Sequence, residues 1–484
     1  MKSYSHHYID GVWVEPSKPD RREIVNPNTE AVFASVANGG TAEDVHRAVV
    51  AARRAFGAFS RTSVAERVAM IDRIIVSYKD RMEELADVLA QEVGVPKSAA
   101  AQVTGPIEHM KVARDLLDSY RFEQRLGDTI IRREPVGVCA LISPWNWPVQ
   151  TPVIKFVYAL AAGCTSIMKG SDASPLSSIL LTEIIDKADL PPGVFNLVLG
   201  RGSVVGEALS RHPDVDLVSF TGSTSAGIKV GEAAASTIKR VTLELGGKSA
   251  NIVLKDADLE AAARWNIERC FFNTGQSCHA PSRMLIHEDQ MEIAIPHLVD
   301  QCTRFRLGDA CDPNTTMGPV INQTQYENIR RYIQSGIDEG AKLVCGGLGR
   351  PEGLDQGFFI QPTVFSDVTA TMTIAKEEIF GPVLAVIPYR TEEEALEIAN
   401  DSIYGLGGYV FSADRNRGRE FANALRAGRI CVNGAPTNPS TPMGGYKQSG
   451  IGRSMGSFGL EEYLEIKSVY GLDEEAAGLP ELIP

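Results

Sequence analysis

Residues 215–248 read VDLVSFTGSTSAGIKVGEAAASTIKRVTLELGGK. An apolar run leads into a Gly-rich turn, then a stretch in which small and apolar residues recur with helical spacing, then a second apolar run. This order is typical of a β-strand, an α-helix and a further strand of the same sheet. The segment therefore predicts a βαβ unit.

The same alternation extends through residues 136–246. GVCALIS, TSIMKGS and VFNLVLG resemble buried strands, while PVIKFVYALAAG, SPLSSILLTEIIDKA and SVVGEALSRH have helical spacing. The first of these helices should end at Gly163, and the second should begin with a serine cap. Together they predict an α/β fold with a doubly wound parallel sheet.

Residues 247–432 form a second alternating block. Its expected helices include DLEAAARWNIERCFF and TQYENIRRYIQSGIDEG, and its expected strands include SRMLIHE, LAVIPYR and GYVFSA. Short strands (YIDGVWV, REIVNPNTE) and then helices to about residue 120 precede both blocks. A last strand, in EEYLEIKSVY, has no obvious partner in sequence and should pair with another segment or another subunit. The acidic tail DEEAAGLPELIP should be loosely held.

The composition argues against several classes of function. The 484 residues carry a net charge of −13, which argues against nucleic acid or an anionic membrane as a partner but allows a nucleotide cofactor. Eight dispersed cysteines without a Cys-x-x-Cys pair argue against a disulfide scaffold or a metal site. The N-terminus lacks an apolar signal core, and the longest apolar run is interrupted by Lys155, so we expect a cytoplasmic protein.

Two Gly-rich turns are candidates for phosphate binding. TGSTSAG (221–227) follows an apolar strand and opens a helix, where free N–H groups and the helix dipole favour a diphosphate. GRGSVVG (200–206) is similar, but neither has the G-x-G-x-x-G spacing. The alternative interpretation is that both are tight turns in an ordinary α/β domain, and for Gly patterns this loose that interpretation is favoured.

Cys278 lies in FFNTGQSCHAPSR among small and polar neighbours. A nucleophilic thiol needs access and nearby donors, which this context offers, whereas an inert cysteine usually lies in an apolar run, as Cys270 does. His279 is adjacent. Because neighbours on an extended chain point to opposite faces, we expect His279 to line a pocket or the surface rather than pair with the thiol.

Glu244 and Asn146 are the other chemical candidates. Glu244 ends an apolar strand, where ligands of open α/β sheets bind, and could serve as a general base. Asn146 lies in ISPWNWPVQTP, where prolines fix the backbone and an amide could donate to a developing oxyanion. A salt-bridged or capping Glu and a rigid structural turn are the alternative interpretations.

The motifs PWNWP, FTGST, LELGGKS, GQSC, EEIFGPV and GGYKQSG occur in this order. In order and spacing the chain resembles the aldehyde dehydrogenase superfamily, from YIDGVWV to EEYLEIKSVY. The resemblance implies that Cys278 attacks the aldehyde, that Asn146 and the N–H of Cys278 hold the oxyanion, and that hydride transfer leaves a thioester. Glu244 would then activate the water that hydrolyses it. No metal is implied.

The resemblance also implies a cofactor site for NAD, with NADP possible. The family often has Glu where this chain has Asp172; the charge that would accept from the ribose 2′-OH is kept, so NAD is favoured. The implied cofactor-binding residues are Ile142, Ser143, Pro144, Trp145, Lys169, Ser171, Asp172, Gly202, Gly206, Phe220, Thr221, Gly222, Ser223, Leu245, Gly246, Glu378 and Phe380.

By the same resemblance the chain divides into three parts. Residues 1–120 and 140–246, with 433–459, would bind the cofactor. Residues 247–432 would form a second α/β domain, the catalytic one, and residues 121–139 and 460–484 a small β oligomerisation arm. A homodimer or homotetramer is implied.

The implied substrate pocket contains no Arg or Lys, which disfavours a short semialdehyde with a carboxylate. Its residues are Trp147, Gln150, Thr151, Ile154, Ser277, His279, Asn438 and Met443. A medium-chain aliphatic, oxo-acid or aromatic aldehyde fits them best. The alternatives are a coenzyme A-acylating semialdehyde dehydrogenase, a thiol esterase without a redox step, and a non-catalytic relative; acylating members typically lack the base that Glu244 supplies.

Overall fold

The computed structural model describes residues 2–471 and 478–481. The βαβ unit predicted at 215–248 is present, as β11 (Leu217–Thr221), α8 (Thr224–Ala235) and β12 (Arg240–Glu244). The two strands are parallel, with Thr221 opposite Glu244 at their carboxyl ends. This register places the Gly-rich turn beside the predicted base.

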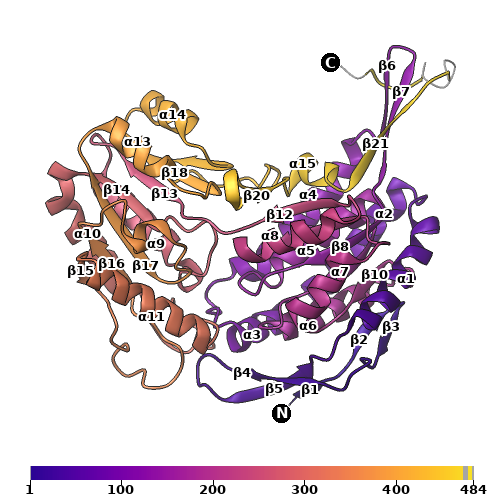
Figure 1. The fold of residues 1–484 in the computed structure, drawn as a ribbon, viewed down its shortest axis with the longest axis horizontal. Helices are drawn as coiled ribbons and strands as arrows, with labels where there is room; N and C mark the ends of the chain where they lie inside the picture. The colour runs from indigo at the N-terminus through magenta and orange to yellow at the C-terminus, as the bar shows by residue number, and fades with distance from the viewer. Residues whose placement is uncertain (1, 472–477, 482–484) are drawn as a thin grey trace.

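The unit belongs to an eight-stranded sheet of order β20-β12-β11-β8-β9-β10-β2-β3 (Figure 1). The five strands from β12 to β10 are parallel, while β20 and β2 flank them in antiparallel orientation. The strand order reverses at β8, which lies between β11 and β9. In open α/β sheets ligands bind outside the carboxyl ends at such a switch point. The other strands are β2 (His7–Ile9), β3 (Val12–Val14), β8 (Val138–Ile142), β9 (Thr165–Lys169), β10 (Phe195–Leu197) and β20 (Gly450–Ile451).

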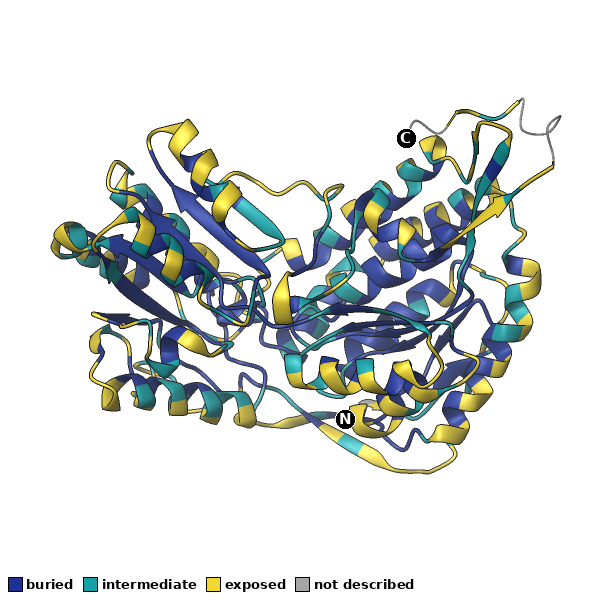
Figure 2. Cartoon of the chain, turned by 45° about the horizontal axis from the view of Figure 1, so that its top comes forward, coloured by how far each residue is buried: buried dark blue, intermediate teal, exposed yellow. Residues whose placement is uncertain are grey.

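Helices surround this sheet, some packed on the strands and others on the first layer of helices, and their outer faces are exposed while the strands are buried (Figure 2). They are α1 (Ala42–Phe59), α2 (Val64–Lys79), α3 (Met82–Glu92), α4 (Ala101–Ser119), α5 (Gln150–Ala162), α6 (Pro175–Asp186), α7 (Glu207–Arg211), α8 and α15 (Gly456–Glu461). Helix α5 ends at Gly163 with a left-handed φ of 92°, as predicted.

The predicted serine cap of α6 is only partly correct. Ser174 occupies the N-cap position, but its side chain makes no capping bond. The buried carboxylate of Glu92 instead accepts from the backbone N–H of Leu176 (2.5 Å) and of Ser177 (3.0 Å). A distant carboxylate has displaced the local cap, which sequence spacing does not reveal.

The second alternating block forms a seven-stranded sheet of order β15-β16-β17-β14-β13-β18-β19, parallel except for the edge strand β15, which runs antiparallel to β16. Its strands are β13 (Ala250–Val253), β14 (Arg283–His287), β15 (Lys342–Cys345), β16 (Thr363–Ser366), β17 (Val383–Tyr389), β18 (Gly407–Phe411) and β19 (Arg429–Val432). Its helices are α9 (Leu259–Cys270), α10 (Met291–Thr303), α11 (Gln323–Asp338), α12 (Thr373–Lys376), α13 (Glu392–Asn400) and α14 (Arg415–Ala424). It forms the second lobe of Figure 1.

The C-terminal strand has its partner within the chain. β21 (Leu464–Val469) pairs antiparallel with β7 (Thr129–Pro135), which pairs with β6 (Glu123–Leu126). This three-stranded arm projects from the first lobe (Figure 1). The next strand, β8, begins at Val138 and belongs to the large sheet. Most of the acidic tail, at 472–477 and 482–484, lies outside the described residues.

A small N-terminal sheet connects the lobes. It consists of β1 (Lys2–Tyr4), β4 (Arg21–Val25) and β5 (Val32–Ala37) in the order β1-β5-β4. The loop after β4 reaches the second lobe, where the carbonyl of Pro27 accepts from the N–H of Phe358 at 2.9 Å. Throughout the described residues, no helix combines the length and apolar character needed to cross a membrane.

Candidate active site

A cavity of 610 Å³ opens where the carboxyl ends of β8, β9, β11 and β12 face the second lobe, and we call it the main cavity. It brings together all three predicted catalytic residues, Cys278, Glu244 and Asn146. All predicted cofactor residues line it as well, with the exception of Gly206, which is buried in the turn before α7.

A strained backbone segment presents Cys278 to this cavity. Asn273, Thr274 and Gly275 have φ angles of 52°, 56° and 72° in succession. Left-handed backbone costs a residue with a side chain roughly 1–2 kcal/mol. A Cβ on Gly275 would lie 2.1 Å from the carbonyl oxygen of Gly381, so only glycine fits there. The contacts around the segment hold it in this shape, and it delivers the thiol at the cavity wall.

Cys278 is partly exposed to the cavity although protein surrounds it. Burial, together with the nearby carboxylates of Glu378 and Glu244, raises the pKa of its thiol to about 12, while the guanidinium of Arg429 opposes this shift. The thiol is therefore protonated at neutral pH in the absence of a ligand. Additional positive charge at the site is needed to favour the thiolate.

His279 lines the cavity, as expected, but it is closer to Cys278 than the extended-chain premise allowed. A turn at these two residues brings Nδ1 of His279 to 3.9 Å from Sγ of Cys278. Burial lowers the pKa of His279 to about 3, so the imidazole is neutral. It also stacks on Trp147, with ring centroids 6.5 Å apart. The imidazole therefore adds a neutral aromatic wall.

Asn146 is connected to the cysteine segment directly. Its Nδ2 donates to the carbonyl of Gln276 at 3.0 Å, and its own carbonyl accepts from Nδ2 of Asn273 at 3.0 Å. The side chain is buried. An amide N–H₂ has two donor hydrogens. One is used by Gln276, so the second can serve a ligand.

Glu244 retains an unused oxygen. Its Oε2 accepts from the hydroxyl of Thr221 at 3.4 Å, whereas Oε1 is buried without a hydrogen-bond partner among the described residues. An unsatisfied buried acceptor is costly unless water or a ligand fills the role. Glu244 is thus available to a guest molecule in the cavity.

Sequence reasoning missed Lys155. This lysine is buried on α5, lines the main cavity and donates to the hydroxyl of Ser219 at 2.8 Å. Burial lowers its pKa to about 8, and Glu244 opposes that shift. A lone lysine within an apolar helix was the signal, because a buried cation requires a partner.

The far end of the cavity meets the chemical needs of a dinucleotide. The first N–H groups of α8, at Thr224 and Ser225, have no acceptor within the described chain, so a diphosphate could bind there. Lys169 is buried at the end of β9 and lines the cavity. Asp172 accepts from Arg22 at 2.9 Å, a contact that the sequence did not suggest.

Glu378 and Phe380 form the opposite wall. Glu378 accepts from the N–H of Gly247 at 3.1 Å, and burial raises its pKa to about 7. A Cβ on Gly246 would come within 2.2 Å of the Glu378 carboxylate. Phe380 packs edge-on against Trp145 with ring centroids 5.2 Å apart. The glycines of LELGGKS therefore make room for this carboxylate.

A second cavity of 310 Å³ adjoins the main one, and we call it the outer chamber. The two share lining by Trp147, Gln150, His279, Arg429 and Met455. The predicted substrate residues are divided between them: Thr151, Ile154 and Met443 line the main cavity, and Ser277 and Asn438 line the outer chamber.

Two arginines that are absent from the predicted substrate residues also line these cavities. Arg269 and Arg429 both line the outer chamber, and Arg429 reaches the main cavity as well. They lie on α9 and β19, outside the motifs from which the pocket was inferred. The sequence carries no local signal for them, because their approach depends on the tertiary fold.

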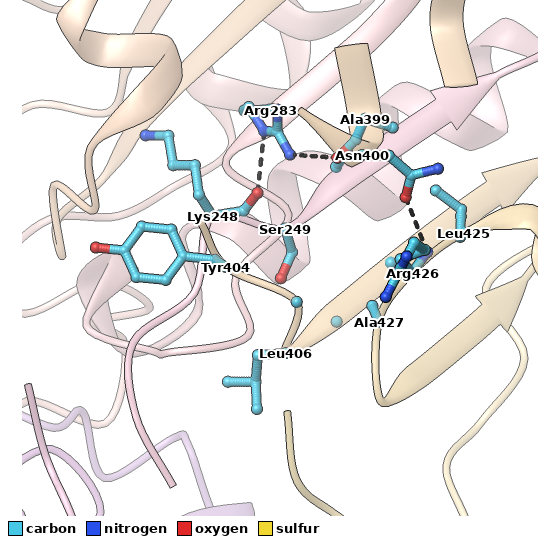
Figure 3. Close-up of a pocket in the computed structure, with 14 residues that line it drawn as sticks. Lys248, Ser249, Arg283, Ala399, Asn400, Tyr404, Leu406, Leu425, Arg426 and Ala427 are labelled. Carbon is cyan, nitrogen blue, oxygen red and sulfur yellow. Dashed lines mark hydrogen bonds between the residues drawn. The ribbon is translucent and has the colours of Figure 1, made fainter. Parts of the chain in front are cut away.

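A third, 20 Å³ cavity lies behind the LELGGKS turn (Figure 3). Lys248 is buried there, and burial lowers its pKa to about 7. Arg283 donates to the carbonyls of Lys248 (3.0 Å) and Ala399 (2.9 Å). This volume suits about one water molecule and no substrate. Across the described part of the chain, no cluster of His, Cys, Asp or Glu could hold a metal ion.

The fold is a doubly wound sheet with a cavity at its switch point, and a cysteine, a carboxylate and an amide donor line that cavity. These features define the class of the protein as an α/β enzyme with a thiol in its active site. A model of the aldehyde dehydrogenase family matches residues 13–469. The chain therefore belongs to the aldehyde dehydrogenase family, and the family and the aldehyde-oxidising activity predicted from sequence are confirmed.

Individual relatives match along nearly the whole chain. A 3-succinoylsemialdehyde-pyridine dehydrogenase of Pseudomonas sp is 49% identical over 477 residues, covering 98% of this chain and 100% of the relative. The structure of an aldehyde dehydrogenase C mutant of Pseudomonas syringae, complexed with NAD+ and octanal, has a TM-score of 0.95 at 48% identity and covers 96% of both chains. The Mycobacterium tuberculosis aldehyde dehydrogenase complexed with NAD+ has a TM-score of 0.94 at 41% identity, covering 97% of this chain and 98% of that one.

Proposed function

We propose that this protein oxidises an aldehyde to a carboxylic acid with NAD as the electron acceptor, through a thioester on Cys278. The observation that carries the proposal is the convergence of Cys278, Glu244 and Asn146 on the main cavity, next to the residues assigned to the cofactor. Relatives that match along the whole chain support NAD, since two of them are complexed with it.

The first half of the reaction forms a carbon–sulfur bond. The Cys278 thiol loses its proton to solvent, and the thiolate attacks the carbonyl carbon. The carbonyl π electrons move to oxygen. The free hydrogen of the Asn146 amide and the N–H of Cys278 stabilise that oxyanion. The chemistry that NAD would supply when bound is a hydride acceptor, so that the thiohemiacetal can become a thioester.

The second half is hydrolysis of the resulting thioester. Glu244 takes a proton from water as the water oxygen bonds to the acyl carbon. The carbon–sulfur bond then breaks, and its electron pair returns to the Cys278 sulfur. The net reaction consumes aldehyde, water and NAD+, and yields carboxylate, NADH and protons. Glu244 disfavours the alternative in which coenzyme A takes the acyl group.

The cofactor would lie along the carboxyl ends of the central strands. The N-terminus of α8 offers N–H groups to the pyrophosphate. Lys169 and Asp172 would bind the adenosine ribose, and Glu378 the nicotinamide ribose. Arg22 holds Asp172 in place, and the negative charge there favours NAD over NADP.

The substrate would be a medium-chain aliphatic, oxo-acid or aromatic aldehyde. Aromatic side chains of Trp147, Phe272 and Trp265 line the outer chamber and offer an apolar path. The Pseudomonas relative is named for 3-succinoylsemialdehyde-pyridine, an oxo-aldehyde with an aromatic ring, and the structure of aldehyde dehydrogenase C contains octanal. Both molecules agree with a substrate of medium size.

Each part of the fold has its own role. The lobe of the eight-stranded sheet binds the cofactor, the lobe of the seven-stranded sheet supplies Cys278, and the arm joins subunits. Exposed apolar side chains on the arm, those of Leu126, Ile466 and Tyr470, support assembly into a homodimer or homotetramer. The cytoplasm suits a protein with eight unpaired cysteines.

The direct test is reduction of NAD and NADP by the pure protein with aliphatic, aromatic and ω-oxo-acid aldehydes. NADH should form with a medium-chain or aromatic aldehyde, and the acid product should appear without coenzyme A. Cys278→Ala should abolish turnover while retaining cofactor binding. Turnover by that variant would contradict the role of the thiol.

A further inference from the structure

The outer chamber is cationic in an acidic protein. The chain has a net charge of −13, yet the residues lining this chamber include two arginines and no aspartate or glutamate. Arg269 comes from the last turn of α9, and Arg429 from the first position of β19. Two elements far apart in sequence thus place like charges around one small space.

Neither guanidinium has a carboxylate partner among the described residues. Within the described part of the chain, Arg269 and Arg429 form no ion pair, whereas Arg22 and Arg240 each contact a carboxylate. Arg429 lies close enough to Tyr409 to act on its pKa, but the Tyr409 hydroxyl itself donates to the carbonyl of His279 at 2.6 Å. A guanidinium has five donor hydrogens. Most of those on Arg429 therefore have no acceptor in the part of the chain that the structure describes, and they are available to a ligand.

The other titratable groups of the chamber are neutral at physiological pH. Burial lowers the pKa of His109 to about 4 and that of His279 to about 3, which leaves both rings uncharged. Burial also raises the pKa values of Cys431 and Tyr409, so neither is anionic. The two arginines are consequently the only charges that face the chamber within the described chain.

We propose that the outer chamber binds a carboxylate at the far end of the substrate, so that the preferred aldehydes are ω-oxo acids. This inference rests on the proposed function. Arg429 borders both cavities and Arg269 only the outer one, so the anionic group lies beyond the reacting carbon. Aromatic walls from Trp147 and Trp265 pack on the connecting chain. Arginine is suited to this contact because its planar fork pairs with both carboxylate oxygens.

The experiment compares a homologous series of ω-oxo acids with their methyl esters, which keep the aldehyde and the chain but lose the charge. The wild-type kcat/KM should favour the acid at the best length. Arg269→Gln and Arg429→Gln should each lower kcat/KM for the acid roughly tenfold or more. Arg269→Gln should leave the ester rate near wild type. Arg264→Gln, an exposed change on α9 away from the chamber, is the matched control and should change neither rate.

Arg429→Lys distinguishes the loss of positive charge from a loss of folding. It keeps the cation and should therefore retain part of the preference for the acid. Equal rates for acid and ester in the wild type, or equal losses on both in the Arg269 variant, would overturn the inference. Oxidation of esters without preference for acids would leave the proposed function intact. Failure to oxidise any aldehyde with either cofactor would contradict the proposed function itself.

Discussion

Nδ2 of Asn146 donates to the carbonyl oxygen of Gln276 at 3.0 Å, across 130 positions of sequence. The bond connects the rigid PWNWP loop to the strained segment before Cys278. It also fixes the orientation of the Asn146 amide, and therefore the direction in which its second hydrogen points. The donor of the proposed oxyanion site is thus fixed by the same segment that delivers the thiol.

Asn146→Ala should lower kcat by about 10²–10³, the usual loss when one oxyanion donor is removed. Asn146→Asp preserves the shape but places an acceptor where the donor was, so kcat should fall at least as far. Steady-state rates for both variants, with NAD binding as the measure of intact structure, test this. An aspartate variant close to wild type would exclude the amide from catalysis.

Arg429 should tune the reactivity of Cys278. Its charge lowers the thiol pKa against the effect of burial and of two carboxylates. Only the thiolate reacts with iodoacetamide, so Arg429→Gln should slow labelling of Cys278 at a given pH, and faster labelling should return at higher pH. Arg269→Gln is the control, because Arg269 does not act on this thiol. Site-resolved mass spectrometry gives the rates, and identical pH profiles would refute the effect.

Glu244→Gln should slow thioester hydrolysis more than hydride transfer. Loss of a general base costs typically 10²–10⁴ in rate, and the amide cannot accept the proton from water. A rapid burst of NADH followed by a much slower steady rate is expected in stopped-flow absorbance. A normal steady-state rate would remove Glu244 from the hydrolytic step. Thr221→Val, which removes the 3.4 Å contact with Glu244 but leaves the carboxylate in place, should slow hydrolysis far less.

The elements that were predictable from sequence are those with strong local patterns. The βαβ alternation placed β8 to β12 and their helices, because buried parallel strands and their crossovers carry unmistakable apolar runs. Gly163 was predictable for the same reason, since a helix end with left-handed backbone calls for glycine. The family motifs then brought Cys278, Glu244 and Asn146 together.

The residues that were missed act through tertiary contacts. Glu92 caps α6 from another helix, Arg22 reaches Asp172 from a small sheet, and Arg429 enters the cavity from the start of β19. None of these side chains is close in sequence to the group it affects. Lys155 differs, because a single cation in an apolar helix is a visible anomaly that requires a partner.

The pair of Arg22 and Asp172 should control the choice of cofactor. Asp172→Ala removes a negative charge and frees Arg22, which now donates to that carboxylate at 2.9 Å. The ratio of kcat/KM with NADP to that with NAD should rise roughly tenfold or more, since one charge-assisted contact is worth about 1.5–3 kcal/mol. The double variant with Arg22→Gln should lose most of this gain. An unchanged ratio in Asp172→Ala would show that this carboxylate does not select the cofactor.

Glu92 should make stability depend on pH. Burial raises its pKa from 4.5 to about 7, although its hydrogen bonds with Ser177 and Leu176 oppose the shift. The folded state therefore binds more protons than the unfolded state between these values, so Glu92 lowers the stability of the fold as pH rises from about 4.5 to 7, by about 3 kcal/mol at most.

Glu92→Gln keeps an oxygen that can accept from the two N–H groups of α6 but does not titrate. The stability of this variant relative to wild type should increase as pH rises from 5 to about 7 and then level off. Chemical unfolding at a series of pH values measures the difference directly. If the difference stayed constant or fell with pH, Glu92 would be ionised throughout, and its carboxylate would be stabilised by the helix N-terminus more than burial penalises it.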